Sequence, residues 1–455
     1  MKHAVSLRVG ARLLAAASMS SAGLAQSNGI PIENGVTAFT NVTIVPMDVE
    51  HTVPSQTVLV RQGRIIGIGP AESIRIPRDA LSIDGRGRYL VPGLVDMHVH
   101  LRDYPENDMA ALLELYIAAG VTTVLNLRGI PRHLELRDRV AKGTLLGPTI
   151  YTSGPFISAT TGSSPTPEEV ERAVVEQKQA GYDIIKIHGD FTREAYHKLF
   201  EVARRERIRV IGHSPRNLGY EVMFEERQDA VAHAEEYIYD TNSRPKDSAA
   251  IEPKFPEIAR ATAAVGTWLV PNLTAYHNIA QQLGDIDAVL GRSEMRYIPP
   301  AVVRQWTPPS NPYLVKYTKA DAGAFFGRYA MLERLTKAFR DAGVRLLVGT
   351  DAMNPSVVPG FSVHDELRDL VHAGLTPYEA LRAATAGPAE FLGASAEFGT
   401  IAVGRRADLI LVGADPLVDV AAASRRIGVM LRGRWFPESE LEANLGATAA
   451  SYRRP

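Results

Sequence analysis

The chain has 455 residues, 45% of them hydrophobic, so it is long enough to form one large domain and a smaller one. Its 50 basic and 51 acidic residues nearly cancel and form no basic tract, which argues against nucleic acid or an anionic membrane surface as a partner. It contains no cysteine, which excludes disulfides and thiolate ligands and leaves His, Asp, Glu and lysine derivatives for any metal.

The first 25 residues have the pattern of a secretory signal peptide. Basic residues precede a short apolar run at 13–17, and the small residues Gly23 and Ala25 stand before Gln26. We therefore expect residues 1–25 to be a signal peptide cleaved after Ala25, and the protein to be periplasmic or secreted. A disordered basic terminus is the alternative. Elsewhere the sequence has no run of 18 apolar residues, so no membrane span is expected.

Short strands are predicted between residues 38 and 91, where alternating runs are separated by turn signals such as Gln62-Gly63. These strands cover 39–45, 57–61, 65–69, 81–84 and 89–91. Near the other end of the chain, strand-like runs return at 399–404, 407–412 and 427–433. We expect segments 36–91 and 396–440 to combine into one small β-sandwich domain.

Between these ends, eight strand-like apolar runs alternate with helical stretches, a pattern typical of βα units and a parallel sheet. The runs cover 94–100, 121–127, 149–154, 183–189, 209–214, 229–234, 267–273 and 345–352. Helices are expected between them, for example at 167–180 and 192–206. Eight such units favour an α/β fold, a closed (β/α)₈ TIM barrel over residues 92–395.

One interval is too long for a simple βα unit. Residues 274–344 separate the seventh and eighth runs and are rich in proline and aromatic residues, including Trp306, Tyr313 and Tyr317. In a barrel, an insertion at this point could cover the C-terminal mouth as a lid or pocket wall. A pair of helices on the outside of the barrel is the alternative.

The first run of this central region carries two histidines that can act together. Residues two apart on a strand point to the same side, so His98 and His100 should present both imidazoles to one place. Two neutral imidazoles on one rigid face can bind a transition-metal ion. Surface histidines on an ordinary strand are the alternative, but the apolar residues flanking this pair fit it poorly.

Further polar residues follow other runs with the same regularity. Catalytic groups in barrels sit at the C-terminal ends of strands, so residues in this position should converge on one mouth. A lysine on a central strand is also costly to bury unless it is neutralised or paired. The residues concerned are Lys186 on the fourth run, His213 after the fifth, His233 after the sixth and Asp351 after the eighth.

These residues and the segments around them resemble the amidohydrolase superfamily, in its imidazolonepropionase-like or dipeptidase-like branch. The resemblance extends from about residue 39 to residue 433, and it is carried by VPGLVDMHVHL, GVTTVLNL, GHSPR, AHAEEY, LVGTDA and GTIAVGRRADLILV. It implies that Lys186 is carboxylated by CO₂ and bridges two divalent metal ions. Zn²⁺ is expected first, with Mn²⁺ or Co²⁺ as alternatives.

The resemblance also divides the remaining ligands between the two ions. It implies that His98, His100 and Asp351 hold one ion and that His213 and His233 hold the other. Two ions bridged in this way would share a water molecule, lower its pKa and yield hydroxide near neutral pH. Asp351 is then the expected catalytic residue, which accepts the proton of that water and passes it to the leaving nitrogen.

The expected function is hydrolysis of a carbon–nitrogen amide bond in a small molecule, with a dipeptide or an N-acyl amino acid as the first choice. A cyclic amide, a lactone or a carbamate cleaved at the same site is the second choice. A metal-free relative that kept the barrel for assembly or binding is the alternative outside enzymes. Whether the protein is a homo-oligomer is left open.

Two departures from the related sequences put the substrate contacts in doubt. Residues 161–164 lack the histidine that some dipeptidase-like members have there, and residues 214–216 lack a tyrosine found in others. Candidate substrate contacts are Arg216, which could pair with a carboxylate, and Arg128, His188, Tyr237, Tyr276 and His277. Each could instead be structural.

Two further groups of polar residues admit structural interpretations. Glu235 and Glu236 could orient a ligand histidine or face solvent. Residues 364–366, His-Asp-Glu, lie on a helical stretch, where we expect capping or pairing.

Overall fold

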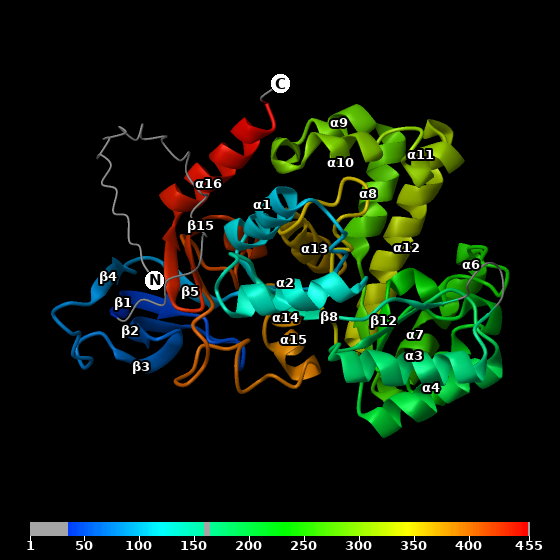
Figure 1. Ribbon diagram of the computed structural model, residues 1–455, viewed down its shortest axis with the longest axis horizontal. Coiled ribbons are helices and arrows are strands. Elements are labelled where there is room, and N and C mark those ends of the chain that lie inside the picture. Colours follow the sequence, from blue (N-terminus) through cyan, green and yellow to red (C-terminus); the bar gives the residue numbers. More distant parts are fainter. Residues whose placement is uncertain (1–34, 159–163, 454–455) are drawn as a thin grey trace, which may run out of the picture.

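The computed structural model describes residues 35–158 and 164–453. The strands of both chain ends lie on one side of the molecule, in blue and red, and most of the central helices lie on the other (Figure 1). The predicted signal peptide, residues 1–25 with its cleavage after Ala25, lies outside the described residues. No helix in the described part of the chain combines the length and the apolar character that a membrane span requires.

The two ends of the chain share one eight-stranded sheet. Its order is β16-β15-β14-β5-β1-β2-β3, with β4 paired to β1, and β14 runs antiparallel to β5. This confirms the prediction that the two ends combine in one sheet. The strands are β1 (Val36–Ile44), β2 (Val53–Arg61), β3 (Arg64–Pro70), β4 (Leu81–Asp84), β5 (Tyr89–Pro92), β14 (Leu409–Val412), β15 (Arg426–Leu431) and β16 (Arg434–Pro437).

This sheet is strongly curved. The rings of Phe39 on β1 and Trp435 on β16 are 5.3 Å apart and meet edge to face, although three strands lie between β1 and β16 in the sheet order. In a flat sheet, four strand spacings of about 4.8 Å each would keep them roughly 19 Å apart. The curved sheet encloses an apolar cluster that includes Val58 of β2, Leu411 of β14 and Met430 of β15.

The prediction of a strand at residues 399–404 is wrong, because this segment forms no strand. Gly399 and Gly404 both have positive φ angles, +94° and +90°, so the chain turns twice within six residues. Its amides therefore bond to separate places, from Ile401 to the carbonyl of Pro46 and from Gly404 to that of Ile65.

The central strands are all parallel and form two hydrogen-bonded groups. One has the order β6-β7-β8 and the other the order β13-β12-β11-β10-β9. The first seven predicted runs each contain one of these strands, and the two-residue strand β9 was not predicted. The strands are β6 (Leu94–Val99), β7 (Val121–Asn126), β8 (Thr149–Thr152), β9 (Ile157–Ser158), β10 (Ile185–His188), β11 (Val210–Gly212), β12 (Ala230–Ala232) and β13 (Trp268–Val270).

The eighth predicted run, residues 345–352, is not a regular strand. It makes only isolated parallel bridges, from Leu346 to Leu269 of β13 and from Ala352 to Val99 of β6. Two of its amides donate elsewhere, that of Thr350 to the carboxylate of Asp96 and that of Val348 to the carbonyl of Ala383, the last residue of helix α14 (Pro377–Ala383). The run nevertheless lies between β13 and β6 and connects the two groups of strands.

The helices follow the strands as predicted, and those expected at 167–180 and 192–206 are present. Thr166 and Glu169 form a reciprocal capping box at the start of the first of these. The helices are α1 (Glu106–Ala118), α2 (Pro131–Ala141), α3 (Pro167–Ala180), α4 (Arg193–Glu206), α5 (Glu221–Glu226), α6 (Ser248–Ile251), α7 (Phe255–Val265), α8 (Leu273–Gly284), α9 (Ile286–Leu290), α10 (Pro300–Gln305), α11 (Pro312–Lys316), α12 (Ala322–Asp341), α13 (Phe361–His372), α14 (Pro377–Ala383), α15 (Ala386–Phe391) and α16 (Glu438–Ser451).

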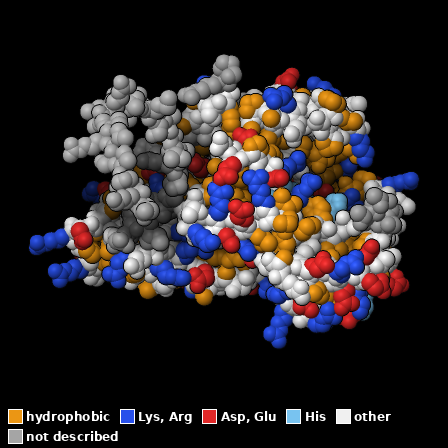
Figure 2. Space-filling model, viewed as in Figure 1, with side chains coloured by type: hydrophobic (Ala, Val, Ile, Leu, Met, Phe, Trp, Pro, Cys, Tyr) orange, Lys and Arg blue, Asp and Glu red, His pale blue; other side chains and the backbone are white. Residues whose placement is uncertain are grey.

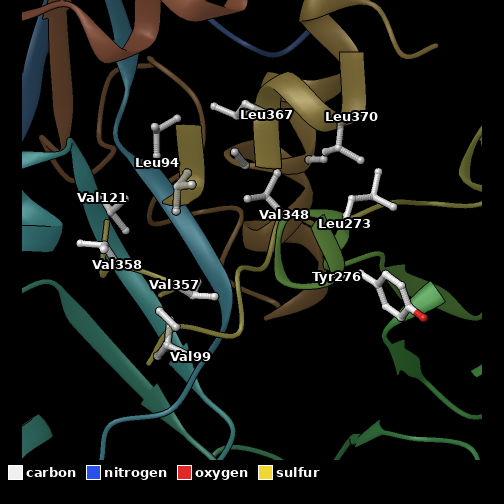
Figure 3. Packing of buried hydrophobic residues seen from close by; sticks show 14 of the residues in the cluster. Leu94, Val99, Val121, Leu273, Tyr276, Val348, Val357, Val358, Leu367 and Leu370 are labelled. Carbon is white, nitrogen blue, oxygen red and sulfur yellow. The ribbon is translucent and has the colours of Figure 1, made fainter. Parts of the chain in front are cut away.

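The largest apolar core joins the strands to the helices that cover them. Figure 3 shows Leu94 of β6 near Leu367 of α13, and Val99 at the other end of β6 beside Val357, all of them buried. Burying each such side chain contributes about 1.5–3 kcal/mol. This packing holds the end of β6, and the histidines there, in a fixed position. On the face shown in Figure 2, acidic and basic side chains are interspersed, in keeping with the near-zero net charge.

Candidate metal centre

Strand β6 delivers two histidines to one place. The rings of His98 and His100 are 5.1 Å apart, so the two side chains share one side of the strand end as predicted. His98 is fully buried, and its Nδ1 donates to Oδ1 of Asn272, 3.2 Å away. Its Nε2, the other ring nitrogen, therefore carries the lone pair.

The eighth run places Asp351 against these histidines. The amide of Asp351 donates to the carbonyl of His98 at 2.7 Å, and its Oδ1 lies 2.6 Å from Nε2 of His100 and 3.4 Å from Nε2 of His98. The close approach requires glycine at position 349, because a Cβ there would come within 2.8 Å of the Cβ of His98. The irregular backbone of this run is thus what brings the carboxylate to the imidazoles.

A buried carboxylate holds β6 and the eighth run together. Asp96 accepts hydrogen bonds from the amide of His98 at 3.2 Å, from the amide of Thr350 at 3.0 Å and from the hydroxyl of Thr350 at 2.6 Å. Asp96 is fully buried. Its two oxygens fix the spacing between the strand that carries His98 and the run that carries Asp351.

Three neighbouring strands bring the remaining predicted ligands to the same place. Lys186 lies on β10, His213 follows β11 and His233 follows β12. The ring of His233 is 4.8 Å from those of both His98 and His213, and its Nε2 is 4.0 Å from Oδ2 of Asp351. The structure therefore brings all six predicted residues together around one point.

The donor set fits divalent metal ions. Ligand atoms of His98, His233 and Asp351 lie within 4.8 Å of one another. Nε2 of His98 and Nζ of Lys186 are buried without a hydrogen-bond partner among the described residues. Orphaned buried groups of this kind are costly, and imidazole nitrogens with carboxylate oxygens are the donors that zinc and its neighbours prefer.

The protonation states also suit metal binding. Burial lowers the pKa values of His98, His213 and His233 well below the usual range, so these rings are neutral and can donate a lone pair. Burial lowers the pKa of Lys186 to about 8. Burial alone would raise the pKa of Asp351, but the histidines and lysine around it lower that pKa to about 2.

Five of the six residues, all except the fully buried His98, border a cavity of about 250 Å³. Among the other residues that line it are Arg128, Phe156, Glu235, Tyr313 and Asn354. Tyr313 belongs to α11 within the insertion at 274–344, so part of that insertion is a pocket wall, as one of the two sequence interpretations expected.

Four of the six candidate substrate contacts, His188, Arg216, Tyr237 and His277, are placed differently from one another. His188 lines this cavity and also, with Arg216, a neighbouring cavity of about 370 Å³. Tyr237 and His277 line neither. Tyr237 is buried with its ring 4.9 Å from that of Phe339, and His277 stacks on a tyrosine of α12 and pairs with a carboxylate of α13.

The paired glutamates after β12 do not simply face solvent. The carboxylate of Glu236 is buried and accepts from Nδ1 of His213 at 2.8 Å, so it orients this ring, with Nε2 as the nitrogen left for a ligand role. The same carboxylate receives Nε and Nη2 of Arg216 at 3.0 and 2.6 Å. Glu235 lines the cavity, and burial raises its pKa to about 8.

The 364–366 segment has the structural role that the sequence suggested. Glu366 is buried on α13 and accepts from the amide of Thr274 at 2.7 Å, which caps the start of α8. Nε2 of His364 donates to the carbonyl of Ala119 at the end of α1. These contacts hold helices around the strands and lie outside the two cavities.

Comparisons with known proteins agree with this architecture. The model of the amidohydrolase family matches residues 89–436. The structure of a putative prolidase from Bifidobacterium longum is 25% identical, with a TM-score of 0.67, and the match covers 91% of this chain and 99% of that one. Bottromycin amidohydrolase is 24% identical, with a TM-score of 0.72, and the match covers 92% and 91% of the two chains.

Matches to curated relatives are shorter. A dihydroorotase from Anaeromyxobacter sp. (strain K) is 40% identical over 73 residues, which is 15% of this chain and 16% of that protein. An enamidase from Eubacterium barkeri is 31% identical over 153 residues, which is 31% of this chain and 39% of the enamidase. The matched segments thus span less than half of these relatives.

Proposed function

Because this chain belongs to the amidohydrolase family, we propose that it is a metal-dependent hydrolase that cleaves a carbon–nitrogen amide bond in a small molecule. One observation carries this proposal: six predicted ligands from five separate segments of the chain lie together, and five of them line one cavity. The six are His98, His100, Lys186, His213, His233 and Asp351.

The proposed centre holds two divalent ions, with Zn²⁺ as the first choice and Mn²⁺ or Co²⁺ as alternatives. His98, His100 and Asp351 would hold one ion and His213 and His233 the other, with carboxylated Lys186 between them. The lowered pKa of Lys186 supports its proposed carboxylation, since the neutral amine is the form that reacts with CO₂. When bound, such ions would lower the pKa of a coordinated water and polarise the scissile carbonyl.

Asp351 is proposed to be the proton carrier of the reaction. Its carboxylate is ionised at neutral pH and lies at the wall of the cavity, so it can accept a proton from water and return it to the leaving nitrogen. Asn354 donates to Oδ2 of Asp351, which holds the carboxylate in one orientation. Asn272 and Glu236 do the same for the imidazoles of His98 and His213.

The proposed substrate is a dipeptide or an N-acyl amino acid. The cavity is lined mainly by polar and charged side chains, with Phe156 and Tyr313 as aromatic walls, which suits a small polar molecule. A cyclic amide, lactone or carbamate at the same site is the second choice. A metal-free binding protein is the alternative outside enzymes, and the unpartnered Nζ of Lys186 argues against it.

We further propose that the central strands close into a (β/α)₈ barrel over residues 92–395. The support is a continuous path of parallel contacts: the bridge from Ser153 to Ile184 joins the two strand groups, and the eighth run joins β13 to β6. The curved sheet at 36–91 and 396–440 is proposed to form the β-sandwich domain. Residues 1–25 are proposed to direct export, with cleavage after Ala25.

A hydrolysis screen tests the proposed function. The protein is loaded with Zn²⁺ or Mn²⁺ and assayed against dipeptides, N-acyl amino acids, lactones and carbamates. Turnover of the first two classes, abolished by chelation, is the expected result. Turnover confined to lactones or carbamates would favour the second choice, and equal rates in His98→Ala would exclude this site as the catalyst.

A further inference from the structure

The positive charges near the cavity are not equivalent. Arg216, the first candidate from the sequence, uses two of its nitrogens on the carboxylate of Glu236, and its guanidinium carbon lies 3.8 Å from the ring centre of Tyr239. Glu235 lies 4.0 Å away on the same side. A guanidinium already committed to a bidentate pair has little left to offer a substrate carboxylate.

Arg128 lies on a different side of the site from Arg216 and its glutamates. Arg128 follows β7, Arg216 follows β11, and the two glutamates follow β12. In the order of the eight parallel segments, β7 and β12 are four positions apart. In the proposed barrel these two positions face each other across the mouth. On the β12 side Glu235 and Glu236 already match the charge of Arg216, so a substrate anion is drawn to the β7 side.

The surroundings of Arg128 leave its guanidinium available. Among residues 35–158 and 164–453, no carboxylate lies within ion-pair distance of it, although it lines the cavity. Its guanidinium carbon lies 5.9 Å from the ring centre of Phe156. That ring supports the flat face of the guanidinium and leaves its N–H groups to bind a carboxylate.

Phe156 also links Arg128 to the metal ligands. Its ring stacks on that of His188, 5.4 Å away and nearly parallel, and meets the ring of His100 edge on at 6.3 Å. One phenyl ring therefore separates the guanidinium from a proposed ligand. In an N-acyl amino acid the carboxylate carbon is only two bonds from the amide nitrogen, so a group that binds this carboxylate must lie close to the proposed ligands, as Arg128 does.

We propose that Arg128 binds the carboxylate of the substrate and makes the enzyme selective for amides whose amine half is an amino acid with a free carboxylate. This inference rests on the proposed function and names the residue that sets its substrate class. It assigns recognition to the β7 side of the cavity and leaves Arg216 as a residue that holds Glu236 and, through it, His213.

The kinetic test compares an N-acetyl amino acid with the same amide lacking the carboxylate. Arg128→Gln should lower kcat/KM for the first roughly 10- to 100-fold, mainly through KM, the scale of a hydrogen bond to a charged group. It should leave the second unchanged, and Arg128→Lys should restore part of the loss. Arg132→Gln is the matched control, since Arg132 on α2 pairs with Asp103 at 2.5 Å and does not line the cavity. This variant should leave kcat/KM unchanged for both substrates.

A binding measurement separates this inference from the proposed function. Calorimetry should show that the wild-type protein binds N-acetyl amino acids more tightly than Arg128→Gln does, and that both bind the decarboxylated amide equally. If no amide is hydrolysed but this difference is found, the proposed function fails and carboxylate recognition stands. Equal losses for both ligands, or no loss for either, would overturn the role of Arg128.

Discussion

Asp351, the proposed proton carrier, has an unusual backbone conformation. Its backbone has φ of +62°, a conformation that is uncommon for residues other than glycine, and its amide bonds to the carbonyl of His98. Strained backbone of this kind persists only where surrounding contacts enforce it, and it is frequent at functional sites. Here those contacts are the hydrogen bonds of Asp96 to both neighbouring segments.

Asp351→Asn separates the two roles proposed for this residue. Asparagine keeps the shape and one oxygen but cannot take a proton from water, so kcat should fall by roughly 10²-fold or more, the usual scale for a general base. Metal content, measured on the same samples, should fall far less. A near-normal kcat with metal retained would remove the proton-transfer role, whereas complete loss of metal would leave only the ligand role.

Lys186→Ala tests the bridging group. The variant should lose activity, and short carboxylic acids added to the assay should restore part of it, because their carboxylates can take the place of the carboxylated amine. Lys198→Ala is the control, since Lys198 is a lysine on α4 that pairs with Glu201 at 2.7 Å, away from the site. Turnover of Lys186→Ala at the wild-type rate without added acid would exclude the bridging role.

At the scale of elements, the sequence was most informative where local pattern and burial agree. The spacing of His98 and His100 on one strand predicted their shared direction, and the polar ends of buried strands predicted where Lys186, His213 and His233 would meet. The lone carboxylate of Asp96 within that same apolar strand is itself a sequence signal of a special role. Its partner Thr350 is 254 positions away, so the contact could not be read from spacing.

Other features depended on long-range contacts in the same way. Asn272, which orients His98, lies 174 positions away in a segment with no periodic pattern that marks it. The apolar character of residues 345–352 predicts a regular strand. Their path is irregular because the amides of Val348 and Thr350 bond outside a strand ladder, to the carbonyl of Ala383 and to the carboxylate of Asp96. Tyr237 lies four residues after the proposed ligand His233, but the turn after β12 directs it into the core, against Phe339.

The contact between α13 and the end of α1 should make stability depend on pH. Burial lowers the pKa of His364 to about 4, against 6.5 for the unperturbed group. Below about pH 6.5 the unfolded chain binds a proton that the folded chain does not, so this contribution is complete above pH 6.5 and is lost as pH falls towards 4. The loss amounts to about 3 kcal/mol, since each pKa unit corresponds to about 1.4 kcal/mol.

His364→Gln removes this titration while keeping an N–H donor for the carbonyl of Ala119. Urea unfolding of both proteins at pH 7 and pH 4.5 should show that the wild type loses roughly 2–3 kcal/mol more than the variant between these conditions. Groups that titrate elsewhere affect both proteins equally and cancel in the comparison. An identical pH dependence in the two would show that His364 does not titrate as its burial indicates.

At the scale of the whole molecule, the chain ends form the curved sheet, and the central region carries the proposed metal centre. The curved sheet joins β5 to β14 across more than 300 positions of sequence and places β6 directly after β5, so the strand that carries the first two histidines begins at a fixed point. The insertion at 274–344 reaches back over the cavity through Tyr313. The proposed metal centre is therefore built by segments from the full length of the central region.

The metal content of the purified protein, measured by plasma mass spectrometry after loading and removal of excess ion, tests this account most directly. About two equivalents per chain are expected in the wild type, with a marked decrease in His98→Ala and His213→Ala. His277→Ala, which alters a histidine outside the cavity, should retain the wild-type content. Hydrolytic activity in a protein with essentially no bound metal, or undiminished metal in both ligand variants, would contradict it.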